Sequence, residues 1–338
     1  EEVTAFINRA ALLLGLQEFH AALKDLVHAM KLDPSLSNGY YNLGLAHQEL
    51  GNLEAADFAY IRAMQIAPSR PLPYLNRGFL ALEGSKFNES DGFSRLAIVC
   101  EPMMVQAYVN LGHVNKQRNR VYEATRAYEW ALNIAPEVPE ALSGMGLLLS
   151  EAAEFEAANN CFDRALRVDP QNADILYNQA HLKLLMGDYS AGWPLYEWRW
   201  RGKQAQRNQI SIPPEGVPLW LGLSALQGKR ILIWPEQGLG DSLQFCRFIP
   251  YLISAGAQVL MEVHPSLCRL MSDSFPNIEV IALGGHRGRL DYHCPIMSLA
   301  LAFSTTLETI PSPGSYLLTR KKCRSQFDEI FQSRPNPR

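Results

Sequence analysis

The sequence has no excess of charge of either sign: 31 lysines and arginines stand against 34 aspartates and glutamates, and the formal net charge is −3. A protein that coats nucleic acid or an anionic membrane needs a strong positive excess, so this balance argues against both kinds of partner. Long apolar runs are also missing, since none approaches the ~20 residues that a membrane-spanning helix needs. We therefore expect a protein that neither binds nucleic acid nor spans a membrane.

Cysteine is scarce and irregularly spaced. No pair has the Cys-x-x-Cys spacing of a zinc ribbon, and the wide separations exclude a disulfide scaffold. Scattered single thiols are typical of the reducing cytosol, so we expect a cytoplasmic protein. No cluster of His, Asp and Glu has the spacing of metal ligands, and no metal is expected. The six cysteines are Cys100, Cys161, Cys246, Cys268, Cys294 and Cys323.

The chain also lacks an initiator methionine and opens on two glutamates, which is unlike a signal peptide. We expect it to be a fragment of a longer protein. Its 338 residues, of which 47% are hydrophobic, are enough for packed cores and suggest two domains.

A repeat of 34 residues fills the first two thirds of the chain, marked by Pro34, Pro68, Pro102, Pro136 and Pro170. Each proline follows a predicted helix and stops it, because proline lacks an N–H and restricts the residue before it. Small residues fall into columns between the prolines and let two helices approach closely. Two such columns are Ala10, Gly44, Gly78, Gly112, Gly146, Ala180, and Ala29, Ala63, Ala97, Ala131, Ala165 followed by Arg199. The pattern predicts helix–turn–helix units that stack to bury their apolar faces.

Two stretches carry a family signature: Tyr-Tyr-Asn-Leu-Gly-Leu-Ala-His-Gln-Glu-Leu-Gly at residues 40–51, and the spaced residues Ala56, Tyr60, Ala63 and Pro68. They resemble the tetratricopeptide repeat (TPR) family. The resemblance covers residues 1–200 as six repeats, the last of which is atypical and caps the array. It implies an α-solenoid, a TPR superhelix whose groove is lined by the first helix of each repeat and binds a protein or peptide.

A further column holds asparagine in five of the six repeats, with Gly144 as the gap. An amide side chain both donates and accepts hydrogen bonds, so a row of them can clamp the backbone of an extended peptide. The TPR part of O-GlcNAc transferase, which this part resembles, uses such a ladder for its protein substrates. The alternative is that the amides only satisfy local groups. The predicted peptide-binding ladder is Asn8, Asn42, Asn76, Asn110 and Asn178.

The sixth repeat ends in aromatic residues. Trp193, Tyr196 and Trp200 share one helical face. We expect this face to dock onto the segment that follows, and a platform for a sugar or a base is the alternative. The basic Arg199 and the basic residues after it are interpreted as solvated, beside a polar linker over residues 201–228 that bears proline and glycine.

The pattern changes period after residue 228. Apolar segments at 230–234, 258–263, 278–283 and 291–295 predict strands, and helical patterns at 242–255, 266–274 and 297–303 alternate with them, with a kink expected at Pro250. This alternation predicts a parallel, Rossmann-like sheet over residues 229–318, with ligands at the carboxyl ends of its strands. The predicted fold class is an α-solenoid followed by a partial α/β Rossmann-like domain.

A glycine loop, Glu236-Gln-Gly-Leu-Gly-Asp241, follows the first predicted strand. Glycines let the backbone approach a ligand, and the helix N-terminus that follows favours anions. Asp241 and Ser242 lie at that N-terminus, where capping the helix is the alternative role, favoured for Ser242. A dinucleotide fingerprint fits less well, because its third glycine is replaced by Leu243 and its acid, Glu262, falls inside a strand.

The same region resembles the heptosyltransferase-like glycosyltransferases of the GT-B fold, and especially bacterial proteins that fuse TPRs to such a domain. The loop carries the resemblance, together with Gly-Lys-Arg-Ile-Leu-Ile at 228–233 and Asp-Tyr-His-Cys-Pro-Ile at 291–296. It implies an inverting transferase that moves a hexose or heptose from a nucleotide-sugar donor to a protein or glycan acceptor, with no other cofactor.

That resemblance also implies roles for individual residues. The loop aspartate of the family is its proposed general base, which here is Asp241. Glu236 is the alternative base. His264 and His293 would assist in the proton transfer, and a structural role is the favoured alternative for each of them. The loop residues that would hold an acceptor or phosphate are Gln237, Gly238, Leu239, Gly240 and Ser242.

A GT-B enzyme closes two Rossmann-like domains around its donor, and the second one holds the nucleotide. Residues 319–338 form a basic tail that is too short for such a domain. We therefore expect the donor-binding half to be missing and the chain as given to be inactive in sugar transfer. The alternative function is a non-enzymatic TPR adaptor whose α/β part is a packed cap.

Overall fold

The computed structural model describes residues 2–202, 214–236, 238–312 and 314–318. The chain divides into two compact units, Glu1–Pro170 and Gln171–Arg338, called here the repeat unit and the sheet unit. The sixth helix pair therefore groups with the sheet, although the sequence groups it with the repeats. No helix among the described residues is both long and apolar enough to cross a bilayer.

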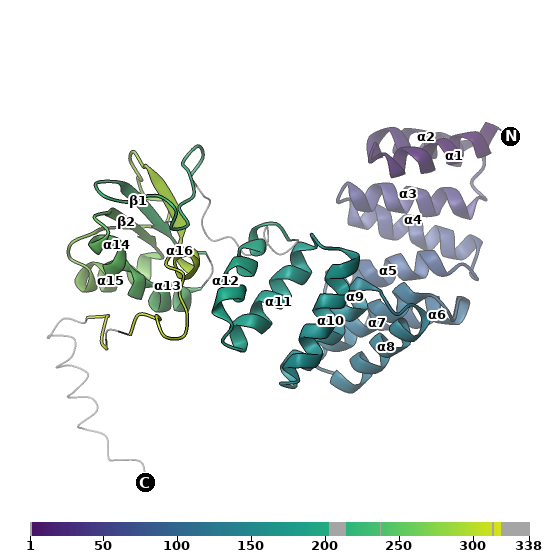
Figure 1. Ribbon diagram of the computed structural model, residues 1–338. Coiled ribbons are helices and arrows are strands. Elements are labelled where there is room, and N and C mark those ends of the chain that lie inside the picture. Colours follow the sequence, from purple (N-terminus) through teal and green to yellow (C-terminus); the bar gives the residue numbers. More distant parts are fainter. Residues whose placement is uncertain (1, 203–213, 237, 313, 319–338) are drawn as a thin grey trace, which may run out of the picture. The chain divides into compact units, whose positions relative to one another are not determined.

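The repeat unit consists of helix pairs that pack side by side in chain order (Figure 1). Each helix pair, or hairpin, ends two residues before one of the periodic prolines, as the sequence predicts. The pairs are α1 (Glu2–Gly15) with α2 (Phe19–Leu32), α3 (Ser37–Glu49) with α4 (Leu53–Ile66), α5 (Pro71–Glu83) with α6 (Phe87–Cys100), α7 (Val105–Gln117) with α8 (Val121–Ile134), and α9 (Pro139–Glu151) with α10 (Phe155–Val168).

Small residues allow the close helix packing, as their columns predict. A Cβ added at Gly44 would lie 2.4 Å from the ring of Tyr60, and one added at Gly112 would lie 2.4 Å from the ring of Tyr128. The alanine column of the second helices, which includes Ala63 and Ala131, is fully buried. Glycine at these positions therefore makes room for a large aromatic side chain from the paired helix.

The hairpin turns share one backbone conformation that does not depend on residue type. In each described turn of the repeat unit one residue adopts a positive φ, and only one of these residues is glycine. In the first turn Gln17 occupies the position that Gly51 occupies in the second, and it adopts the same backbone conformation. The residues are Gln17 (61°), Gly51 (76°), Ser85 (58°), Asn119 (55°) and Ala153 (62°).

Replacing Ala153 by glycine is expected to stabilise the repeat unit by about 0.5–1 kcal/mol, because glycine avoids the clash that a Cβ makes in the left-handed region. Thermal unfolding followed by circular dichroism should give a higher Tm. The reverse change in the second turn, Gly51→Ala, should lower the Tm. A lower Tm for Ala153→Gly would contradict this explanation of the turns.

The sheet unit begins with helices α11 (Ala173–Leu185) and α12 (Tyr189–Tyr196) and the 3-10 turn η1 (Glu197–Trp200). A four-stranded parallel sheet follows, in the order β3-β2-β1-β4, and its strands confirm the sequence prediction to within a residue at most ends. Leu232 at the centre pairs with Leu260 on one side and with His293 on the other. The strands are β1 (Arg230–Trp234), β2 (Gln258–Val263), β3 (Glu279–Ala282) and β4 (Tyr292–Pro295).

Short helices follow the strands, and the longest predicted helix is interrupted. Instead of one helix over 242–255, a 3-10 turn η2 (Cys246–Phe248) separates two helices, and Pro250 lies in the first turn of the second. This is the kink that the proline predicts, placed just before it. The helices and turns are α13 (Leu239–Phe245), α14 (Ile249–Ser254), η3 (Pro265–Leu267), α15 (Cys268–Ser274), η4 (Ile296–Ser298) and α16 (Leu299–Ala302).

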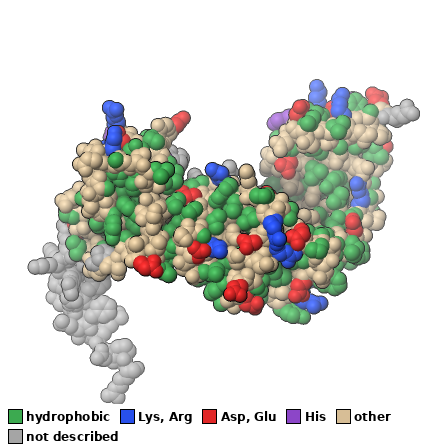
Figure 2. All heavy atoms as spheres, in the orientation of Figure 1, with side chains coloured by type: hydrophobic (Ala, Val, Ile, Leu, Met, Phe, Trp, Pro, Cys, Tyr) green, Lys and Arg blue, Asp and Glu red, His purple; other side chains and the backbone are tan. Residues whose placement is uncertain are grey.

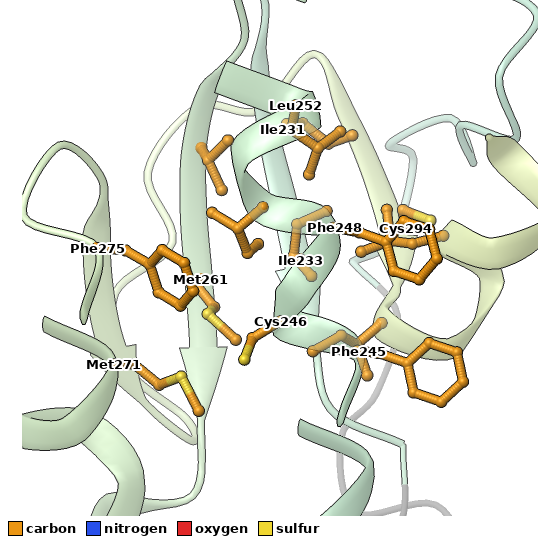
Figure 3. Packing of buried hydrophobic residues seen from close by; sticks show 14 of the residues in the cluster. Ile231, Ile233, Phe245, Cys246, Phe248, Leu252, Met261, Met271, Phe275 and Cys294 are labelled. Atoms are coloured by element: carbon orange, nitrogen blue, oxygen red, sulfur yellow. The ribbon is translucent and has the colours of Figure 1, made fainter. Parts of the chain in front are cut away.

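The core of the sheet unit lies between the sheet and these helices. Figure 3 shows strand side chains facing those of the helices and turns, among them Ile231, Ile233, Met261, Cys294, Phe245, Cys246, Phe248, Leu252, Met271 and Phe275. The opposite sheet face is also buried, because Leu232, Trp234 and Leu260 pack with Trp200. Burial on both faces is typical of a parallel sheet.

Part of the predicted linker belongs to the fold. Leu219 forms a parallel bridge to His293, and the backbone N–H of Trp220 donates to the His293 carbonyl at 2.8 Å. The Trp220 side chain is 5% exposed and packs in the core of the sheet unit. Residues 219–220 therefore extend the sheet edge beyond β4, and the interpretation of the whole 201–228 segment as a linker is wrong there. Residues 203–213 lie outside the described residues.

Candidate functional site

The asparagine column does not form a uniform surface. Asn8 is exposed and Asn42 and Asn76 are partly buried, whereas Asn110 is only 4% exposed. The last member, Asn178, lies on α11 in the sheet unit, where it is partly buried. The predicted peptide ladder remains a prediction, and the first three asparagines are the members of the repeat unit that a ligand can reach.

Two of the amides join neighbouring hairpins. The Asn76 Nδ2 donates to the Tyr60 hydroxyl at 3.2 Å, and this hydroxyl donates to Gln48 Oε1 at 2.8 Å. The Asn110 Nδ2 donates to Ser94 Oγ at 3.1 Å. In both cases the partner lies 16 residues earlier, on the second helix of the preceding hairpin. At these positions the amides satisfy local groups, which is the alternative role that the sequence leaves open.

The gap in the column has a steric cause. A Cβ added at Gly144 would lie 2.3 Å from the Tyr128 ring and 2.7 Å from its hydroxyl, so the ring occupies the space of a side chain. The Tyr128 hydroxyl is buried and has no hydrogen-bond partner among the described residues. Tyr60 and Tyr128 are thus matched residues that differ in hydrogen bonding, because the counterparts of Gln48 and Asn76 are Lys116 and Gly144.

Tyr60→Phe and Tyr128→Phe are expected to have different effects on the free energy of unfolding. Tyr60→Phe removes a hydroxyl that bonds both Gln48 and Asn76. It should destabilise the protein by about 1–3 kcal/mol, because the two amides lose this partner. Tyr128→Phe removes a buried hydroxyl without a partner and should leave stability unchanged or raise it by up to about 1 kcal/mol. Urea unfolding of both variants measures the difference, and equal destabilisation would show that the Tyr128 hydroxyl has a partner.

The second candidate site is the loop between β1 and α13. Asp241 is the third residue of α13, and its Oδ2 accepts from the backbone N–H of Gly238 at 3.0 Å. The N-cap of α13 is Gly238, and Ser242 lies inside the helix and is 1% exposed. The interpretation of Ser242 as the helix cap is therefore wrong. Gly238, Leu239 and Gly240 are exposed, and Gln237 lies outside the described residues.

Glu236, the alternative base, lies in a buried ion pair. Its two carboxylate oxygens accept from Arg199 Nε at 2.6 Å and from Arg199 Nη2 at 3.0 Å, and Oε1 also accepts from the Met297 N–H at 3.1 Å. The Glu236 side chain is 2% exposed and that of Arg199 is 5% exposed. Burial raises the pKa of the Glu236 carboxyl, and the Arg199 guanidinium opposes this shift. In this arrangement the carboxylate anchors structure and does not face solvent.

Arg199 ties the sixth hairpin to the sheet. Its Nη1 donates to Glu197 Oε1 at 2.8 Å and its Nη2 donates to Ser298 Oγ at 2.7 Å. Its guanidinium also lies over the rings of Tyr196 and Trp200, 4.6 and 4.5 Å from their centroids. The interpretation of Arg199 as a solvated residue is therefore wrong, whereas the predicted docking of the aromatic face onto the following segment is confirmed. The sequence signal for this role was a charged residue in a column of alanines.

The two histidines do not join the loop. The His293 Nδ1 accepts from the Trp234 Nε1–H at 3.1 Å on the sheet, and burial followed by the nearby Arg287 charge lowers the pKa of its imidazole. His264 is exposed and its Nδ1 contacts the Ser266 hydroxyl at 2.8 Å. Neither ring has a hydrogen bond to the loop among the described residues. Asp241 is thus the predicted acid–base residue that remains partly exposed beside the glycines.

Glu262, the acid that the dinucleotide alternative requires, already has partners within the protein. The Glu262 side chain is buried, and its Oε2 pairs with Arg287 Nη2 at 2.7 Å while its Oε1 accepts from the Gly284 N–H at 3.2 Å. A carboxylate that binds a ribose hydroxyl must face the ligand. The structure therefore gives Glu262 a structural role at the end of β2.

Comparison with known proteins identifies the repeats. Two tetratricopeptide repeat models match, over residues 37–70 and 161–192. The chain therefore contains tetratricopeptide repeats. Among curated proteins, it is 28% identical over 162 residues to Protein FlbA of Caulobacter vibrioides, which covers 42% of this chain and 26% of FlbA. It is 42% identical over 55 residues to heat shock protein STI1 of Saccharomyces cerevisiae, which covers 16% of this chain and 9% of STI1.

Solved structures share the fold of the repeats. The structure of Pseudomonas aeruginosa PilF matches with a TM-score of 0.53 and 21% identity, over 61% of this chain and 96% of PilF. PilW, a type IV pilus biogenesis factor, matches with a TM-score of 0.54 and 18% identity, over 61% of this chain and 98% of PilW. At these identities the likeness concerns the fold alone. The chain spans about a quarter of FlbA and a smaller part of STI1.

Proposed function

We propose that this chain is a TPR scaffold that binds a protein or an extended peptide along the first helices of its hairpins. The observation that carries the proposal is the asparagine column on successive first helices, of which Asn8, Asn42 and Asn76 remain at least partly exposed. Each amide can donate to and accept from a peptide backbone. Phe79, one helical turn beyond Asn76, is 38% exposed and adds apolar surface to the same helix.

Asn42→Ala tests this proposal, because among the described residues the Asn42 side chain makes no hydrogen bond to a neighbouring hairpin, so its loss should not affect folding. A peptide library displayed on phage is selected against the chain, and the affinity of the selected peptides is measured by fluorescence anisotropy. Asn42→Ala should weaken binding by about 5- to 30-fold, the value of one or two backbone hydrogen bonds. Asn133→Ala, which removes an exposed asparagine from the second helix α8, is the matched control and should have no effect.

Sugar transfer by the sheet unit is a second candidate function, favoured by one observation. A partly exposed Asp241 follows exposed glycines at the carboxyl end of a central parallel strand, where α/β proteins bind ligands. In this proposal the unit is the acceptor half of a GT-B glycosyltransferase of the inverting type, Asp241 takes the acceptor hydroxyl proton, and a nucleotide sugar is the donor.

Two measurements test the second candidate. Calorimetry of this chain with nucleotide sugars should show no binding, because the proposal assigns the donor to a further domain. In a longer polypeptide that transfers sugar, Asp241→Asn should lower kcat by at least about 100-fold, the usual loss for a missing general base. Unchanged turnover in that variant would remove Asp241 from the mechanism.

A further inference from the structure

The Tyr128 hydroxyl is a buried hydrogen-bonding group that the free chain does not use. The side chain is 0% exposed, and its oxygen has no hydrogen-bond partner among the described residues. Burial raises the pKa of this hydroxyl, so it keeps its proton and can donate. A buried polar group without a partner lowers the stability of a fold, so folding alone does not account for the hydroxyl.

The ring of Tyr128 lies between two first helices. It belongs to the second helix α8, and Cβ atoms added at Gly112 on α7 and at Gly144 on α9 would both meet it. At Gly112 the three nearest atoms are ring carbons, whereas at Gly144 they include the hydroxyl oxygen, at 2.7 Å. The hydroxyl is therefore the end of the side chain that reaches the first helix of the fifth hairpin.

This hydroxyl continues the row of asparagine amides. Gly144 is the gap in the asparagine column, and the Tyr128 hydroxyl takes up space that an asparagine side chain would need there. In the second hairpin the equivalent hydroxyl, that of Tyr60, is occupied, because the Asn76 amide bonds it. In the fourth hairpin the corresponding amide is missing, which leaves the Tyr128 hydroxyl available to a ligand.

Lys116, by its position, is the side chain that covers this hydroxyl. It stands where Gln48 stands two repeats earlier, and Gln48 Oε1 accepts from the Tyr60 hydroxyl at 2.8 Å. The Lys116 ammonium instead lies 3.6 Å from Glu151 Oε1, and the two side chains are 26% and 60% exposed. Because a lysine stem is flexible and an exposed ion pair is weak, this side chain can move aside at little cost.

The groups near the hydroxyl do not favour a charged ligand. Lys116 and Glu151 balance each other, and burial lowers the pKa of the neighbouring His113 imidazole to about 4, so this ring is neutral at pH 7. Figure 2 shows acidic and basic side chains interspersed on one face of the repeat unit. A neutral acceptor, such as a main-chain carbonyl oxygen, is therefore the group that fits the hydroxyl donor.

We propose that the Tyr128 hydroxyl donates a hydrogen bond to a main-chain carbonyl of the bound peptide, in place of the amide that is missing at Gly144. The inference rests on the proposed scaffold function and deepens it, because it adds a binding group at the fourth and fifth hairpins. The hydroxyl lacks a partner in the free chain and gains one from the peptide. Its removal should therefore have different effects on stability and on affinity.

Tyr128→Phe tests this inference in two measurements. At ~3.3 Å per residue, an extended peptide of about 12 residues passes four first helices that lie roughly 8–10 Å apart, so the phage library displays peptides of this length. Fluorescence anisotropy should show that the variant binds the selected peptides about 3- to 10-fold more weakly, since one hydrogen bond is lost. Urea unfolding without peptide should give an unchanged or higher midpoint, which a purely structural hydroxyl would not combine with weaker binding.

A matched control and Asn42→Ala complete the experiment. Tyr122→Phe makes the same change at a tyrosine of α8 that is 73% exposed, and it should alter neither measurement. If Asn42→Ala weakens binding and Tyr128→Phe does not, this inference is overturned and the scaffold function stands. If neither variant weakens binding, or if no peptide is selected, both are overturned. A lower urea midpoint for Tyr128→Phe would also overturn the inference, because the hydroxyl would then have a partner in the free chain.

Discussion

Arg199→Ala is expected to destabilise the sheet unit by about 3–5 kcal/mol. The substitution leaves the buried Glu236 and the partly buried Glu197 without their shared cation, and an uncompensated buried charge costs about that much. It also removes the contacts of the guanidinium with the Tyr196 and Trp200 rings, so packing is lost with the charge. Hydrogen exchange read by mass spectrometry measures the effect on β1 and α12 separately from the repeat unit.

The control and the rescue both follow from the same geometry. Arg201→Ala removes a neighbouring arginine, which is exposed and lies over Trp198, and should change stability by less than about 0.5 kcal/mol. Arg199→Met with Glu236→Gln replaces the charged pair by groups that tolerate burial and should recover part of the loss. If Arg199→Ala leaves exchange in β1 unchanged, the ion pair does not hold the sixth hairpin to the sheet.

Gly144→Asn, which fills the gap in the asparagine column, is expected to destabilise the repeat unit by about 2–4 kcal/mol. Overpacking a core typically costs about 1–3 kcal/mol, and here the new side chain meets the Tyr128 ring, which cannot leave without opening the contact between α8 and α9. Urea unfolding measures the loss.

A double variant distinguishes the clash from any intolerance of asparagine at this position. Tyr128→Ser with Gly144→Asn reproduces the pair that Ser94 and Asn110 form one repeat earlier, and it should be more stable than Gly144→Asn alone. Tyr128→Ser alone creates a cavity and serves as the reference. Additive losses in the double variant would show that the two positions do not interact.

The periodic part of the fold could be predicted from the sequence because local rules repeat there. Proline at a fixed spacing and small residues in columns determine where helices end and how closely they pack, and the strands around Leu232 and Leu260 are marked by short apolar runs. The extended pairing at Leu219 and Trp220 could not be predicted, because it depends on backbone bonds to β4 more than seventy residues later. A polar segment with proline and glycine gives no sign of such a partner.

The candidate site was harder to predict than the fold. The asparagine column identifies a position on the first helices, but periodicity does not distinguish an amide that faces a ligand from one that binds the preceding hairpin. Asn110 binds Ser94, and that depends on a side chain 16 residues away. The sequence identifies Glu236 as a candidate base in the loop. It does not reveal that Glu236 is buried, because the burial depends on Arg199, which lies at the end of the sixth helix pair.

The ties between Arg199 and the sheet also bear on the order in which the protein forms during synthesis. Contacts within and between neighbouring hairpins of the repeat unit join residues that are a few tens of positions apart in sequence. The hydrogen bond from Arg199 to Ser298 joins residues that are 99 positions apart. At roughly 5–20 residues per second, the sixth hairpin leaves the ribosome about 5–20 seconds before its partners exist. In the first part of that interval the rings of Trp193 and Trp200 also lack Phe245 and Trp234, which follow them by 52 and 34 residues, so this aromatic face stays uncovered until the sheet begins to form.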